Sequence, residues 1–151
     1  MDRTYTLSGA LEYGKQGKIE EWVHEFLLGV GDNPTFSEGL KLQKRFYAGP
    51  VRMPLHLFKR ICGPEEDMKY RNPAEGFELH VGNMVSAIRE GWDMPPLIVQ
   101  FGEEGLELND GNHRFEALIR TGETHHHVIF WTSAEKDLVK LQSWLLGIEH
   151  E

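Results

Sequence analysis

Residues 95–131 read PPLIVQFGEEGLELNDGNHRFEALIRTGETHHHVIFW, in which strand-like, turn-like and helix-like segments alternate. Residues 97–101 form an apolar run that is too short for a helix and rich enough in aliphatic side chains for a buried strand. The glycines in residues 102–105 favour a hairpin. Residues 106–109 alternate apolar and polar side chains, so we expect a second strand beside the first.

The hairpin leads into a turn and a short helix. Residues 110–112, Asp-Gly-Asn, favour an unusual backbone turn and the capping of a helix start. From His113 the apolar residues recur at helical spacing, and Gly122 is expected to end the helix. Residues 128–131 form an apolar returning strand. This order of elements predicts three strands of one small sheet.

The rest of the chain is predicted to be mainly helical, with a short edge strand over residues 4–7. Apolar side chains recur most regularly at i, i+3, i+4 and i+7 in residues 18–30. Helices are expected over residues 18–30, 37–47, 54–62, 77–91 and 134–147. Cys62 is interpreted as a buried small hydrophobe. Residues 64–73 are polar and rich in turn formers, so we expect a surface loop and a candidate lid.

These elements predict an α/β (α+β) fold, in which a small mixed sheet is surrounded by helices. The apolar stripes of the helices need a sheet face to cover. We therefore expect Trp22, Phe26, Phe115 and Leu118 to be buried.

Charge and composition limit the function classes. The chain has 24 acidic against 16 basic residues, a net charge of −8, whereas binding of duplex DNA normally requires a basic face. We therefore expect no tight DNA binding by the chain itself. No apolar run reaches membrane-spanning length and the N-terminal residues lack a signal-peptide core, so a cytoplasmic protein without a membrane partner is expected.

The junction between residues 106–109 and the following helix is suited to anions. Unpaired backbone N–H groups converge there with the positive end of the helix dipole, and Arg114 could clamp a phosphate with two hydrogen bonds. An alternative is purely structural. In that case Asp110 or Asn112 only caps the helix, while Arg114 pairs with Glu103 or Glu107 at the surface. Spacing alone leaves both interpretations open.

The pattern Gly-x-x-Arg, which opens a helix directly after a strand, resembles a motif of the ParB/sulfiredoxin superfamily. The similarity extends over residues 85–131, in AIREGWDMPPLIV, LELNDGNHRFEALIRTG and VIFW, and DGNHR is close to the DGHHR form of the free-serine kinase branch. The resemblance implies a single ParB/sulfiredoxin-like domain over residues 1–151, with a helical N-terminal portion and a motif core at about residues 77–131.

The resemblance also assigns roles to residues of the DGNHR segment. Nucleotide phosphates are expected against Gly111, Asn112, His113 and Arg114. Asp110 would hold Mg²⁺ or accept a hydroxyl proton, and His113 would act with it or shape the loop. The implied cofactors are a nucleotide (ATP, ADP or CTP) and Mg²⁺. One of the glutamates at 103, 104 and 107 could supply a second acid.

Two departures from the superfamily narrow the expected function. Sulfiredoxin has a cysteine where this chain has Asn112, which argues against sulfiredoxin activity. Chromosome-partitioning ParB proteins continue into a helix-turn-helix domain, whereas 20 residues follow Trp131 here, enough for one helix.

The run of His125, His126 and His127 is a weaker candidate site. In a strand these residues alternate faces, so His125 and His127 could share one face as a pair of metal ligands. A solvated strand edge is the preferred interpretation because no third ligand is near in sequence.

Two hypotheses for function remain. The first is a nucleotide-binding protein that acts as an NTP-dependent phosphotransferase on a small-molecule substrate, or as a nucleotide hydrolase, at the DGNHR loop. The second is a non-catalytic partition-related or regulatory module that binds a nucleotide, or binds DNA through a partner.

Overall fold

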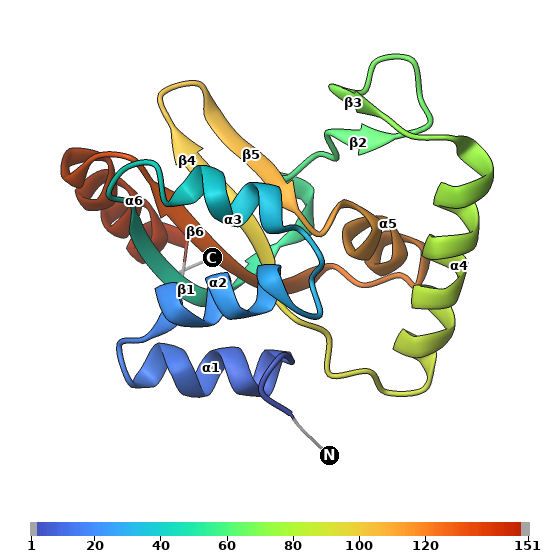
Figure 1. Cartoon of the computed structure of the whole chain (residues 1–151), viewed down its shortest axis with the longest axis horizontal. Coiled ribbons are helices and arrows are strands. Elements are labelled where there is room, and N and C mark those ends of the chain that lie inside the picture. The colour runs from blue at the N-terminus through green and yellow to red at the C-terminus, as the bar shows by residue number, and fades with distance from the viewer. Residues whose placement is uncertain (1–2, 149–151) are drawn as a thin grey trace.

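A four-stranded mixed sheet organises the structure, a computed structural model that describes residues 3–148 (Figure 1). The strand order is β1–β6–β4–β5, and β6 runs parallel to β4 but antiparallel to β1. The strands of this sheet are β1 (Phe46–Pro54), β4 (Leu97–Gly102), β5 (Gly105–Asp110) and β6 (His125–Thr132). The predicted hairpin is the antiparallel pair β4–β5. The predicted α/β fold with a small mixed sheet is therefore confirmed.

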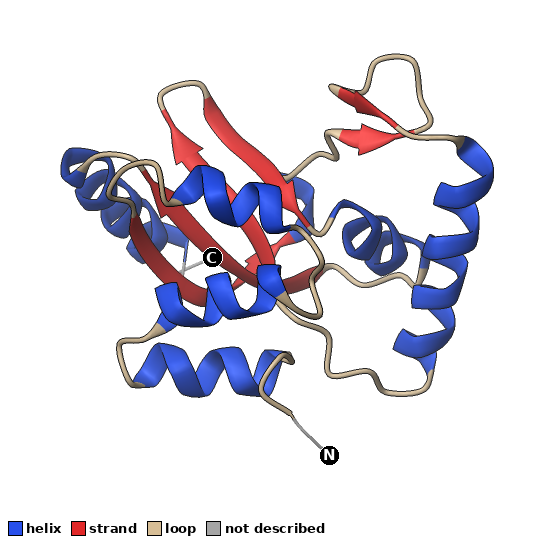
Figure 2. Ribbon diagram, in the orientation of Figure 1, coloured by secondary structure: helices blue, strands red, loops and turns tan. Residues whose placement is uncertain are grey.

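Helices cover both faces of the sheet (Figure 2). The α-helices among the described residues are α1 (Leu7–Lys15), α2 (Ile19–Leu28), α3 (Pro34–Leu40), α4 (Ala74–Arg89), α5 (Asn112–Arg120) and α6 (Glu135–Ile148). A 3₁₀ turn, η1 (Leu55–Leu57), follows β1. The short strands β2 (Cys62–Gly63) and β3 (Tyr70–Arg71) pair in parallel beside the main sheet. None of the helices within residues 3–148 is long and apolar enough to cross a bilayer.

Residues 97–99 of β4 and 128–131 of β6 are buried on both faces of the sheet, which explains their apolar runs. Alternate side chains point to opposite faces of a strand. Ile98 and Ile129 accordingly pack with the residues of α1, α2 and α3, whereas Val99 and Phe130 pack with α5 and α6. The four residues expected in the core are buried, as follows: Trp22, Phe26, Phe115 and Leu118.

Two of the predicted helices are wrong. Residues 37–47 contain only the end of α3, at Leu40, before strand β1 begins at Phe46. Residues 54–62 contain only the 3₁₀ turn η1 instead of a helix. β1 lies at the sheet edge, and its pairing with β6 shifts register between Ala48 and Val51. This irregularity accommodates Pro50, which has no N–H for a regular ladder. Pairing with a strand that is distant in sequence therefore overrode the local helical spacing.

The predicted edge strand over residues 4–7 is also wrong, because Thr6 caps helix α1. Its Oγ1 accepts a hydrogen bond of 3.2 Å from the N–H of Gly9. Cys62 lies in β2 and is half-buried, not on an apolar helix face. Residues 64–69 connect β2 with β3, and Asn72 then leads into α4.

The histidine run opens β6, where it pairs with residues 52–54 of β1, while the pairing of β6 with β4 begins at Val128. All three histidines are partly buried, and Nε2 of His126 lies 3.2 Å from the carbonyl oxygen of Pro95. Within residues 3–148, no three His, Cys, Asp or Glu side chains are grouped to hold a metal ion.

The burial of His126 predicts acid sensitivity. Burial lowers the pKa of His126 to about 4. The unfolded chain takes up this proton near the ordinary value of 6.5, so the stabilisation is complete above 6.5 and is lost as the pH falls toward 4. The loss from this group by pH 4 is expected to be about 3 kcal/mol.

Urea unfolding of the wild type and of His126→Gln between pH 4 and pH 8 measures this effect. The variant should lose less unfolding free energy on acidification than the wild type, and its transition at pH 8 shows that it is folded. Equal acid dependence in both proteins would show that His126 is not the group responsible.

Candidate functional site

A cavity of about 520 Å³ opens where β5 meets the N-terminus of α5. Helix α5 lies between the main sheet and α4 (Figure 1). Residues of α2, α4, β5 and α5 all contribute to the walls of the cavity. All five residues of the DGNHR segment line it, together with Phe26, Val30, Gly31, Asp32, Asn33, Cys62, Asn72, His80, Met84, Trp92, Pro95 and Asn109. The structure thus places the whole DGNHR segment in one cavity, whereas the histidine run lies outside it.

A bulge and a glycine shape the turn into α5. The register between β4 and β5 shifts after Ile98, so Asn109 is an extra residue just before Asp110. Gly111 follows with φ of +100°, a conformation that other residues rarely adopt. A Cβ atom there would lie 2.8 Å from Cδ2 of Leu97 and 2.9 Å from Nη2 of Arg114. Backbone conformation and close approach therefore both require glycine.

The first turn of α5 has no side-chain cap. Gly111 is the N-cap, and the first turn contains no acidic residue. The N–H groups of Asn112, His113 and Arg114 have no partner within the helix, because intrahelical bonding starts with the N–H of Phe115. They carry the positive end of the helix dipole.

Arg114 is buried, with 7% of its surface exposed. Its Nη2 donates to the carbonyl oxygen of Pro96 at 2.9 Å and to Oδ2 of Asp110 at 3.3 Å. Its guanidinium carbon lies 5.3 Å from the ring centroid of Phe26. Its Nε is buried without a hydrogen-bond partner. The alternative in which Arg114 pairs with Glu103 or Glu107 at the surface is therefore wrong.

Asp110 joins three parts of the site. Besides its contact with Arg114, its Oδ1 accepts a hydrogen bond of 3.1 Å from Nδ2 of Asn33, in the loop between α2 and α3. The carboxylate is 8% exposed. Because an ionised carboxylate has about four lone-pair sites, it retains accepting capacity beyond these two bonds.

Both ends of the Asn112 amide make hydrogen bonds within the protein. Its Oδ1 accepts from the N–H groups of Ile61 at 2.7 Å and Cys62 at 3.2 Å, and its Nδ2 donates to Leu108 at 3.1 Å. Asn112 therefore attaches the β2 segment to α5. What it can still offer a ligand is its main-chain N–H and the second N–H of Nδ2.

His113 packs against two rings of α4 in a tilted arrangement. Its ring centroid lies 5.1 Å from that of Phe77 and 4.9 Å from that of His80, both on α4. Burial lowers the pKa of His113, and the adjacent His80 lowers it further. A neutral imidazole near pH 7 can donate one hydrogen bond and accept another.

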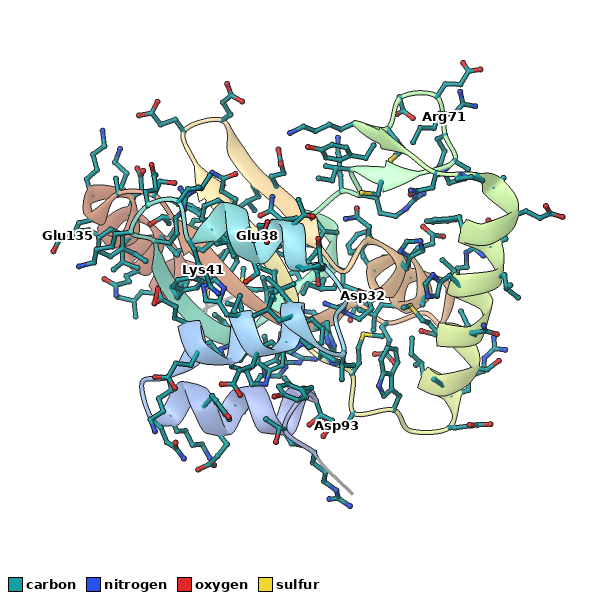
Figure 3. The ribbon with its side chains drawn as sticks, viewed as in Figure 1. Asp32, Glu38, Lys41, Arg71, Asp93 and Glu135 are labelled. Atoms are coloured by element: carbon teal, nitrogen blue, oxygen red, sulfur yellow. The ribbon has the colours of Figure 1, made fainter. Side chains whose placement is uncertain are left out.

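The structure adds residues that the local sequence did not indicate. Asn33, Asn72 and His80 reach the cavity from other elements. Asp32 has φ of +47°, the one positive value at a non-glycine position among residues 3–148. Figure 3 shows Asp32 on the α2–α3 loop, on the side of α5. The left-handed backbone of Asp32 points to a functional position, but it is visible only in the structure and not in the sequence.

The glutamates of the hairpin are not part of this cavity. Glu103, Glu104 and Glu107 line a separate hollow at the other end of β4 and β5. Glu107 also pairs with Lys69, at 3.1 Å. The second carboxylate at the site is therefore that of Asp32.

Comparison with known proteins gives one structural likeness. No protein-family model matches the chain, and no curated protein matches it. The crystal structure of sulfiredoxin from Arabidopsis thaliana is similar over 63% of this chain and 94% of that chain, with 19% sequence identity and a TM-score of 0.43.

Proposed function

We propose that the cavity binds the phosphate group of a nucleotide against the N-terminus of α5. The observation that carries the proposal is the Nε of Arg114, a buried donor without a partner that lies beside an uncapped helix start. A phosphate oxygen would satisfy this donor. Others would accept from the main-chain N–H groups of the first turn, where the helix dipole favours negative charge.

The shape of the site fits this ligand. Gly111 lets the backbone approach the phosphate closely, and a cavity of about 520 Å³ is within the size range of small-molecule sites. Asp32 and Asp110 add negative charge to the lining, which opposes a bare polyphosphate. Mg²⁺ commonly joins one or two carboxylates to substrate phosphates. Asp110, with Asp32 near it, would hold such an ion, which would neutralise phosphate charge.

The role of Asp110 would differ between an enzyme that turns the nucleotide over and a module that only binds it. In a phosphotransferase or nucleotide hydrolase, its free accepting capacity would take a proton from the attacking hydroxyl or water. In a binding module without turnover, Asp110 would serve only to anchor Asn33 and Arg114. One observation favours the binding module: each oxygen of Asp110 already accepts one hydrogen bond within the protein, from Asn33 and from Arg114.

Calorimetric titration with ATP, ADP, CTP and inorganic phosphate, with and without Mg²⁺, tests the binding proposal. Arg114→Lys keeps a positive charge but removes Nε, so binding should weaken by about 1.5–3 kcal/mol, the usual value of a hydrogen bond to a charged group. Arg120→Lys, on the same helix outside the cavity, is the matched control and should bind as the wild type does. Absence of binding by the folded wild type would refute the proposal.

Product analysis then separates the two outcomes. Asp110→Asn should preserve most of the nucleotide affinity and suppress turnover, because an amide does not accept the proton and is a poor Mg²⁺ ligand. Binding without any product in the wild type would assign the protein to the non-catalytic class.

A further inference from the structure

Asn72 is a second unsatisfied polar residue in the cavity. Its backbone is fixed by an N–H bond of 2.7 Å to the carbonyl oxygen of Gly63, while its side-chain amide makes no hydrogen bond to any described residue. Within residues 3–148, three buried side-chain nitrogen or oxygen atoms lack a partner, those of Tyr47, Asn72 and Arg114. Two of the three belong to residues that line this one cavity.

The two unsatisfied groups differ in chemistry. Nε of Arg114 can only donate, which suits a phosphate oxygen. The amide of Asn72 can donate through Nδ2 and accept through Oδ1, and Oδ1 is the buried atom. A buried polar group without a partner is unfavourable, so a ligand that supplies the partner would be stabilised at this position.

A hydroxyl group is the partner that matches an amide best. It donates to Oδ1 and accepts from Nδ2, and it does so whichever way the amide is turned. An ammonium group could use Oδ1 alone and would be better placed against the carboxylate of Asp32. The cavity also exceeds the size of one phosphate, which leaves room for the carbon skeleton that carries the hydroxyl.

We propose that the ligand is a phosphate ester that bears a hydroxyl group, such as the sugar phosphate part of a nucleotide, and that Asn72 selects it by binding that hydroxyl. This inference rests on the proposed phosphate site. It adds Asn72, in the segment between β3 and α4, as a residue that determines specificity. Asn72 would bind the hydroxyl group, whereas Arg114 would bind the phosphate.

Titration of the full chain with paired probes tests the inference. The probes are inorganic phosphate, ethyl phosphate, 2-hydroxyethyl phosphate, 2-aminoethyl phosphate and ribose 5-phosphate. The wild type should bind the better of the two hydroxyl-bearing esters at least about tenfold more tightly than ethyl phosphate, as expected for one buried hydrogen-bonded pair. Asn72→Ala should abolish this preference and leave the affinity for ethyl phosphate and inorganic phosphate unchanged.

Asn109→Ala is the matched control. Asn109 also lines the cavity, but its amide is occupied, with Oδ1 accepting from Nε1 of Trp131 at 2.8 Å and Nδ2 donating to Glu107. Once circular dichroism shows that it is folded, this variant should keep the preference for hydroxyl-bearing esters.

Each other result has a definite meaning. If the wild type binds inorganic phosphate but shows no hydroxyl preference, or if Asn72→Ala retains the preference, the role of Asn72 is refuted and the phosphate site stands. Preference for 2-aminoethyl phosphate would overturn the assignment of a hydroxyl in favour of an ammonium group. If no probe and no nucleotide binds, the phosphate site itself is refuted.

Discussion

Replacing Arg114 by alanine is expected to lower the free energy of unfolding by about 3–5 kcal/mol, the usual cost of breaking a buried ion pair. The reason is the burial of both partners, since Arg114 and Asp110 are 7% and 8% exposed. Removal of the guanidinium leaves the carboxylate with Asn33 as its remaining side-chain partner and leaves the carbonyl of Pro96 without its donor. Urea unfolding measures the loss.

Arg120→Ala is the control for this experiment, because Arg120 lies on the same helix and pairs with Glu78 and Glu116 at the surface. Exposed pairs contribute little, so its loss should be much smaller. The double variant Asp110→Ala/Arg114→Ala should lose less than the sum of the two single variants, since neither partner is then left alone. Similar small losses for Arg114→Ala and Arg120→Ala would contradict the assignment of Arg114 as a buried, structural cation.

Gly111→Ala is expected to be the second strongly destabilising change, at roughly 2–5 kcal/mol. This sum combines about 1–2 kcal/mol for a left-handed backbone and about 1–3 kcal/mol for overpacking. The added Cβ would meet Leu97 at 2.8 Å and displace Nη2 of Arg114. The variant should therefore also lose phosphate affinity, measured at a temperature and urea concentration where it remains folded.

Gly105 offers a matched control with a similar backbone. Its φ is +110°, but a Cβ there would meet nothing within 4 Å. Gly105→Ala should show only the conformational loss of about 1–2 kcal/mol and should bind phosphate as the wild type does. Equal losses at the two positions would mean that packing against Leu97 and Arg114 does not constrain Gly111.

Arg114 also explains why stability and binding must be measured together. Its Nη2 donates to the fold, its Nε is buried without a partner, and the residue lines the cavity. A truncation therefore removes both functions. Arg114→Lys separates them better than alanine does, because it retains the charge that Asp110 requires.

The central unit could be predicted from sequence because its signals are local. Residues 97–101, 106–109 and 128–131 lie within β4, β5 and β6, and the helix predicted from His113 corresponds to α5. Apolar runs identify strands that are buried on both faces, and the glycines mark the turns between them. The apolar spacing that predicted α2 is likewise a pattern among neighbouring residues. The DGNHR segment is contiguous, so its five residues were bound to lie close together.

Strand β1 could not be recognised in the same way. Its sequence, FYAGPVRMP, contains a Gly-Pro pair that reads as a helix end, and its strand conformation depends on pairing with β6 about 80 residues later. Such pairing is a property of the folded chain, because β structure responds to neighbouring strands more than to local preference.

The hairpin, the glycine turn and the helix that follows Asp110 could be predicted locally, because backbone preference and apolar spacing act between near neighbours. Which side chains of this segment remain available to a ligand depends instead on long-range packing. Packing against Phe26 and Pro96 buries Arg114, and Ile61 and Cys62 occupy the amide of Asn112. Long-range packing also brought Asn72 into the cavity, because hydrogen-bond partners and burial are set by segments that meet only on folding.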